Sequence, residues 1–216
     1  MADVTSGAVA VGSPVSQATY LKDYRPPNFF IDRTDLEFDL FKDKTTVNAH
    51  LTLRRNTAVN DAPELVLSGE NLHLVSVSIN GFIQPDDNYQ VNRQQLIISS
   101  PPDQFTLSIV TEIDPANNLS LEGLYLSDGM YCTQCEPEGF RRIGYFPDRP
   151  DVMTVFTVRI EADKRFLQLL SNGNLVETGD CDNDRHFAIW HDPHPKPSYL
   201  FAAVVGDLDR AVDHFV

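Results

Sequence analysis

Leu36-Glu-Phe-Asp-Leu40 and Val47-Asn-Ala-His-Leu-Thr-Leu-Arg54 are two runs in which apolar and polar residues alternate. Lys42-Asp-Lys-Thr45, between them, is a polar stretch typical of a turn. Because successive side chains of a strand point to opposite faces, the alternation predicts two strands that each bury one face. The short connection predicts that they pair as an antiparallel hairpin.

Similar short runs continue along the chain, separated by turn residues. They cover residues 64–67, 75–79, 82–83, 96–98, 105–111, 124–127, 154–160, 166–170, 175–177, 186–191 and 199–205. Asn80-Gly81 is the strongest hairpin signal, because both residues tolerate the positive φ of a tight two-residue turn. Helix is expected at most as a single turn within residues 138–145. The pattern predicts an all-β fold, a large twisted β-sandwich with little helix.

Composition narrows the class of protein. The chain has 216 residues, 42% of them hydrophobic, which is enough for one large β domain or two small ones with a core. Its formal net charge is −14, so it lacks the basic surface that a nucleic-acid partner requires. No apolar run approaches the length of a membrane span, and no secretory signal begins the chain. Three cysteines are an odd count for a disulfide framework, so we expect a reducing cytoplasm.

Tyr131-Cys-Thr-Gln-Cys-Glu-Pro-Glu-Gly-Phe-Arg-Arg142 is the densest cluster of chemically versatile residues. If residues 130–136 are extended, Cys132, Gln134 and Glu136 share one face of the strand. An amide beside a carboxylate on one face could hold a small cationic group. Gln134 and Glu136 are therefore the candidate binding residues, with two solvated surface side chains as the alternative.

The other polar clusters have plainer interpretations. Cys132 and Cys135 could form half of a zinc site or a redox dithiol, but no second ligand pair and no βαβ context support either, which favours inert thiols. The histidines at 186, 191 and 194 favour strand-edge or loop positions over metal ligation, because prolines flank His194. We expect residues 141–151, rich in Arg and Asp, to form ion pairs behind Glu136. No nucleophile elbow, phosphate loop, dinucleotide fingerprint or His-Glu-x-x-His is present.

At these residues the chain resembles a known family. Cys132-Thr-Gln-Cys-Glu-Pro-Glu-Gly-Phe-Arg-Arg142, Tyr145-Phe-Pro-Asp-Arg-Pro-Asp151 and Leu170-Ser-Asn-Gly-Asn174 resemble the N-terminal domain of bacterial aminopeptidase N, a zinc metallopeptidase of the gluzincin group. Lys22-Asp-Tyr-Arg-Pro-Pro27, Asp192-Pro-His-Pro-Lys-Pro197 and Leu200-Phe-Ala-Ala-Val-Val-Gly-Asp207 resemble it too. The similarity runs from residue 20 to about 212, with its blocks in the same order.

The resemblance implies a saddle-shaped β domain over residues 20–212, after a disordered tail at 1–19 and before the start of a linker at 213–216. It implies a partner, the enzyme's own downstream catalytic domain, which would carry the zinc ligands. It further implies that Glu136 binds the α-amino group of a peptide with a free N-terminus, and that Gln134 lines part of the pocket for the first side chain. The complete enzyme would release N-terminal residues, and this chain alone would be inactive.

Two other classes of protein remain open from the residues alone. A stand-alone β-sandwich binding module would need its own ligand pocket. A structural interaction domain would leave Gln134 and Glu136 without a role.

Overall fold

The long hairpin at residues 36–54 lies at the centre of the structure. The computed structural model describes residues 20–59, 64–209 and 211–214, so the expected tail at 1–19 and residues 215 and 216 of the expected linker lie outside the described residues. Strand β1 (Phe29–Leu40) pairs antiparallel with β2 (Thr45–Arg55), and Leu36 lies opposite Ala49. The predicted hairpin is confirmed, and it extends further toward both ends than the alternating runs indicate.

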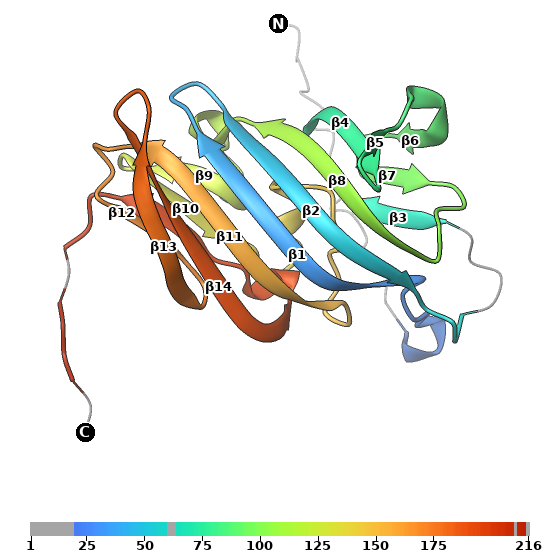
Figure 1. The fold of residues 1–216 in the computed structure, drawn as a ribbon. Helices are drawn as coiled ribbons and strands as arrows, with labels where there is room; N and C mark the ends of the chain where they lie inside the picture. The colour runs from blue at the N-terminus through green and yellow to red at the C-terminus, as the bar shows by residue number, and fades with distance from the viewer. Residues whose placement is uncertain (1–19, 60–63, 210, 215–216) are drawn as a thin grey trace, which may run out of the picture.

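The hairpin belongs to an eight-stranded sheet, whose long strands cross Figure 1 diagonally. The strand order is β13-β14-β11-β1-β2-β8-β4-β5. The remaining strands of this sheet are β4 (His73–Ile79), β5 (Phe82–Ile83), β8 (Gln104–Ile113), β11 (Met153–Asp163), β13 (Asn174–Cys181) and β14 (Arg185–Pro197). One pair, β1 with β11, is parallel, and the other pairs are antiparallel.

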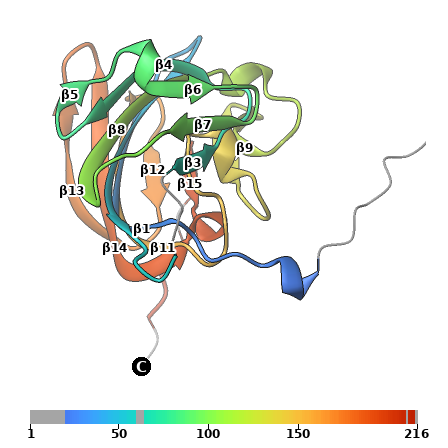
Figure 2. The same ribbon diagram turned by 90° about the vertical axis from the view of Figure 1, so that its right-hand side faces the viewer.

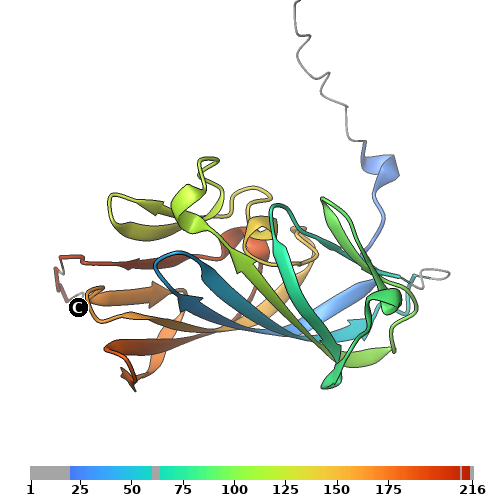
Figure 3. The ribbon, with the colours of Figure 1, turned by 90° about the horizontal axis from the view of Figure 1, so that it is seen from above.

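Two smaller sheets cover one face of the large one. The four-stranded sheet has the order β12-β15-β10-β9, and the three-stranded sheet has the order β3-β7-β6. Their strands are β9 (Gly123–Ser127), β10 (Met130–Gln134), β12 (Gln168–Ser171), β15 (Ala203–Gly206), β3 (Leu65–Ser68), β6 (Tyr89–Val91) and β7 (Gln95–Ile98). Figures 2 and 3 show both small sheets on the same side of the large sheet.

This layering follows from the alternation in β1. Leu36, Phe38 and Leu40 are buried, whereas Glu37 and Asp39 point to the opposite, polar face. One face of the large sheet therefore packs on the small sheets and the other faces water. The all-β sandwich expected from the sequence is confirmed.

Aromatic rings fill the space between the large and the four-stranded sheets. Phe140 contacts Phe146, Phe156 and Phe201 with ring centroids 4.9, 6.3 and 5.3 Å apart, mostly edge to face. All four rings are buried. Since Phe140 follows the Glu136 segment directly, this cluster fixes the candidate binding residues to the core.

Two of the local elements agree with the sequence, whereas the strand expected over residues 199–205 is shorter: residues 198–200 form a 3-10 turn and the strand begins at Ala203. The hairpin between β4 and β5 turns at Asn80 and Gly81, with φ of 52° and 82°, as the Asn-Gly signal predicts. The expected helical turn within residues 138–145 is the 3-10 turn η4 (Phe140–Arg142). The other 3-10 turns are η1 (Leu21–Asp23), η2 (Asp86–Asn88), η3 (Pro115–Asn117) and η5 (Ser198–Leu200). In the described ranges, no helix is long and apolar enough to cross a membrane.

A network around the buried Arg185 joins three neighbouring strands of the large sheet. The Arg185 guanidinium donates hydrogen bonds to the Leu40 carbonyl oxygen, 2.9 Å away, to the Glu161 carboxylate, 3.0 Å away, and to Asp39. Burial alone would raise the pKa of Glu161, but hydrogen bonds from Arg185, Arg159 and Cys181 outweigh it and lower that pKa to about 2. The ionised carboxylate thus stabilises the sheet.

We predict that Glu161→Gln flattens the acid limb of the stability curve. The pKa of Glu161 is lower in the folded chain than the about 4.3 of an unfolded one. The contribution of the ionised Glu161 to the free energy of unfolding is therefore complete above about pH 4.3 and is lost as the pH falls toward 2. Urea unfolding at pH 7 should show a loss of about 2 kcal/mol, and the stability of the variant should depend less on pH below 4.5. The exposed Glu37→Gln in β1 is the control, and an equal pH response in wild type and Glu161→Gln would contradict the prediction.

Candidate functional site

Glu136 lies in a tight turn directly after β10. The strand ends at Gln134, so the expected alternation through residue 136 is wrong: residues 136–139 turn the chain back. The turn closes through a hydrogen bond of 3.0 Å from the Gly139 amide to the Cys135 carbonyl oxygen. Glu138 has a φ of 71°, which is costly for a residue with a side chain and indicates a turn held by its surroundings.

Gln134 and Glu136 are nevertheless brought together by a different contact. The side-chain amide of Gln134 donates a hydrogen bond of 3.0 Å to the backbone carbonyl oxygen of Glu136. Both side chains are exposed. Gln134 therefore braces the backbone that carries Glu136, and its own amide oxygen stays available to a ligand.

The Glu136 carboxylate differs from its neighbour in charge pairing. Glu138 lies 3.3 Å from Nη1 of Arg141. Among the described residues, no Lys, Arg or His lies within ion-pair distance of the Glu136 carboxylate. An exposed carboxylate without a cation beside it suits a cationic ligand group.

A hollow of about 500 Å³ opens beside this carboxylate, and we call it the Glu136 hollow. Its walls come from three segments of the chain and comprise Glu136, Pro137, Glu138, Asp148, Arg149, Pro150, Ser198 and Tyr199. Gln134 is not among these residues, so it does not line the hollow. The positive charge of Arg149 is already matched by Asp151, 2.6 Å away, which leaves the hollow negative at Glu136.

Asp148 holds the three segments together. Its side chain is 2% exposed and accepts hydrogen bonds from the Arg141 amide and from Arg141 Nε, at 3.2 and 3.1 Å. Its other oxygen accepts a bond of 2.6 Å from the Ser198 hydroxyl. The expected ion pairs behind Glu136 are thus present, and Asp148 is the residue at their centre.

The two cysteines of the motif do not form a reactive pair in the structure. Both are free thiols, and burial raises the pKa of each; at Cys135 the nearby Asp148 carboxylate raises it further. Protonated thiols are poor nucleophiles and poor metal ligands, which fits the interpretation as inert side chains.

The histidines have structural partners. Nε2 of His186 lies 2.8 Å from the Phe166 carbonyl oxygen, and Nδ1 of His191 lies 3.2 Å from the Thr157 hydroxyl. Residues 20–59, 64–209 and 211–214 contain no group of three or more His, Cys, Asp or Glu side chains placed to hold a metal. The residues present therefore do not fit a zinc site.

Sequence reasoning missed the second wall of the hollow. Ser198 and Tyr199 belong to η5 and reach the site because the buried Asp148 bonds to Ser198 across 50 residues. The proline spacing before η5 predicts an extended chain, and β14 is indeed extended to Pro197. Nothing in that pattern indicates what the end of the strand contacts.

Gly139→Ala should displace the turn that carries Glu136. A Cβ at residue 139 would lie 2.3 Å from the backbone oxygen of Gln134, which cannot move aside as a side chain could. We expect a loss of about 1–3 kcal/mol in urea unfolding. Gly144→Ala is the matched control, because a Cβ there meets nothing within 4 Å. Equal stability of the two variants would show that the turn is not tightly packed.

Comparison with known proteins agrees with this architecture. Aminopeptidase N of Caulobacter vibrioides is 54% identical over 200 residues, a match covering 93% of this chain and 23% of the relative. Aminopeptidase N of Escherichia coli is 51% identical over 200 residues, covering 92% and 22%. The chain therefore spans less than a quarter of the length of these relatives.

Solved structures show the same fold. Aminopeptidase A of Legionella pneumophila, in complex with aspartic acid, superposes with a TM-score of 0.86 and is 37% identical, over 90% of this chain and 23% of that one. An M1 zinc metallopeptidase from Deinococcus radiodurans, bound to a Tyr-Ser-Ala substrate, superposes with a TM-score of 0.70 at 17% identity, over 83% and 42%, and shares the fold. Residues 29–200 match the family model of the peptidase M1 N-terminal domain. The β-sandwich with its Glu136 turn thus belongs to the peptidase M1 N-terminal domain family.

Proposed function

We propose that this chain is the substrate-anchoring domain of a zinc-dependent aminopeptidase, with Glu136 as the anchor. In this proposal Glu136 binds the free α-amino group of a peptide, and Gln134 contributes to the pocket for the first side chain. The observation that carries the proposal is the exposed Glu136 carboxylate, which has no cation beside it in the described chain and lies on a turn fixed to the core. The relatives being aminopeptidases supports a peptide amine as the cation.

The geometry suits positioning and not bond cleavage. A carboxylate that accepts hydrogen bonds from an ammonium group fixes the end of the peptide, which sets the distance from that end to the bond to be cut. Removal of a single residue follows from such a fixed distance. The chemical step needs zinc ligands that the described residues do not supply, so we assign the zinc to a catalytic domain elsewhere in a longer polypeptide. Such a protein would work in the cytoplasm, where the three free cysteines stay reduced.

Glu136→Gln in the complete enzyme should raise KM and lower kcat/KM by about 10- to 100-fold, because a charge-assisted bond contributes roughly 1.5–3 kcal/mol. Glu122→Gln is the matched control and should stay near wild type, because this exposed carboxylate lies outside the hollow and is already paired with Arg142 at 3.0 Å. The comparison is made with one amino-acid anilide and with its analogue that lacks the α-amino group. The effect of Glu136→Gln should disappear with the analogue, whereas an equal effect on both substrates would remove Glu136 from the amine site.

The 216-residue chain alone should hydrolyse neither leucine nor alanine anilide, with or without added zinc. The complete enzyme should hydrolyse one or both, and a chelator should abolish that activity until zinc is restored. Zinc-dependent anilide hydrolysis by the purified chain would contradict the proposal that this chain only anchors the substrate. The activity would have to co-purify with the chain through successive columns at constant specific activity.

A further inference from the structure

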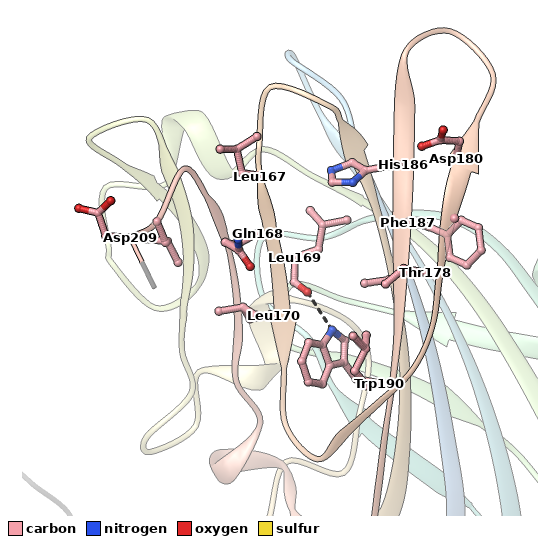
Figure 4. A pocket seen from close by; sticks show the side chains of 14 residues that line it. Leu167, Gln168, Leu169, Leu170, Thr178, Asp180, His186, Phe187, Trp190 and Asp209 are labelled. Carbon is pink, nitrogen blue, oxygen red and sulfur yellow. Dashed lines mark hydrogen bonds between the residues drawn. The ribbon is translucent and has the colours of Figure 1, made fainter. Parts of the chain in front are cut away.

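A second site lies where the edges of the eight-stranded and four-stranded sheets face each other. A groove of about 650 Å³ separates β12 from β13 and β14 (Figure 4), and we call it the edge groove. Its floor is apolar and includes Leu169, Leu175 and Trp190. Asp180 and Asp209 lie at its rim, on opposite sides in Figure 4. None of these residues belongs to the Glu136 hollow.

Two cross-sheet hydrogen bonds fix the positions of the two sides of the edge groove relative to each other. The indole N–H of Trp190 in β14 donates to the Leu169 carbonyl oxygen of β12, 2.8 Å away, as Figure 4 shows. Nε2 of His186, also in β14, lies 2.8 Å from the Phe166 carbonyl oxygen. These contacts brace the two sheets against each other, so the groove is preformed.

Both strands that border the groove are sheet edges. β13 is the last strand of the eight-stranded sheet and β12 the last of the four-stranded sheet. In β12 the Leu169 carbonyl oxygen already accepts the Trp190 indole N–H, so β13 is the edge to which a strand can be added: one row of its backbone N–H and C=O groups has no paired strand among the described residues. Along its eight residues β13 is mostly exposed, with Leu175 and Val176 exposed to 52% and 62%.

The register of β13 predicts which side chains an added strand would need. Leu175 pairs with Trp190, Thr178 with Ala188 and Asp180 with His186, so these three side chains of β13 face the groove. The spacing of three between the first two arises from a register shift between Leu175 and Glu177. A strand beside β13 would place every second side chain over the apolar floor.

The other side chains of an added strand would lie on the outer face, next to Glu177. On that face, Glu177 has no cation within ion-pair distance among the described residues, whereas Asp180 and Asp209 lie on the groove side. Asp180 is paired with Lys164 at 3.1 Å, an exposed contact that contributes little. With a net charge of −14 on the chain, basic side chains are favoured at these positions.

We propose that the edge groove binds an extended peptide segment that alternates apolar and basic residues and adds to β13 as a ninth strand. The apolar side chains enter the groove against Leu175 and Trp190, and the basic ones lie beside Glu177. The backbone groups of the segment pair with the free edge of β13. This proposal does not rest on the aminopeptidase assignment, because the segment needs no free amino group.

Trp190 makes the test direct, since it is the single tryptophan of the chain. The probe is an eight-residue peptide of alternating Leu and Lys, acetylated and amidated so that Glu136 has no α-amino group to bind. Titration should change the fluorescence of Trp190 with saturation, and hydrogen exchange should slow in residues 174–181. An alternating Leu and Glu peptide should bind at least tenfold more weakly. Absence of both the fluorescence change and the protection would overturn the proposal.

Three further comparisons separate the parts of the proposal. Leu175→Lys should weaken binding about tenfold or more by removing apolar contact and adding repulsion. Val75→Lys in β4, where the side chain is also 52% exposed, should bind as wild type does. A probe methylated on alternate backbone nitrogens should lose binding. Full binding by that probe, or by the Leu175→Lys variant, would overturn strand addition. If the protein forms dimers through residues 174–181 without peptide, the occupant of the groove is a second copy of the chain and not a peptide.

Discussion

The buried carboxylate of Asp148 is the contact on which the candidate site depends. A carboxylate with 2% of its side chain exposed is tolerated because it accepts three hydrogen bonds, two from Arg141 and one from Ser198. These donors belong to η4 and η5, so Asp148 sets the distance between segments that the sheets alone would not hold together. The turn that carries Glu136 and the residues across the hollow are thereby held in a fixed relative position, which is what a binding site needs.

The fold could be predicted from the sequence because its signals are local, whereas the site could be predicted only partly because it depends on long-range contacts. Burial of one face imposes a period of two on Leu36, Phe38 and Leu40, and that period is visible in the letters. Asn80-Gly81 is equally plain, because few residues tolerate its dihedral angles. Both signals involve residues that are close together in the sequence, so they can be recognised without the tertiary structure.

Glu136 shows where local reasoning fails. The alternation predicts a strand through Glu136, but β10 ends two residues earlier, at Gln134, where the chain turns back and Gly139 packs closely against the Gln134 backbone. The sequence likewise does not predict that Tyr199 lines the hollow. Periodicity indicates which residues are buried. A site assembled from three segments depends instead on long-range contacts, and no periodic pattern in the sequence predicts those. The pairing of an amide with a carboxylate indicated Gln134 and Glu136 as candidates, the family resemblance implied a role for each, and the structure adds how each is held.

One pairing in the large sheet has a consequence for how the chain is made. The central strand β1 has β11 as its parallel neighbour, and Arg33 lies opposite Val155. A ribosome that adds about 5–20 residues per second needs on the order of 10 s to pass from one to the other. During that interval β1 and β2 can form their hairpin, but one edge of the hairpin has no partner and its apolar face has no complete cover. During synthesis, the incomplete sheet therefore exposes an edge that can pair with other nascent chains. A chaperone bound to residues 29–55 during this interval would prevent such pairing.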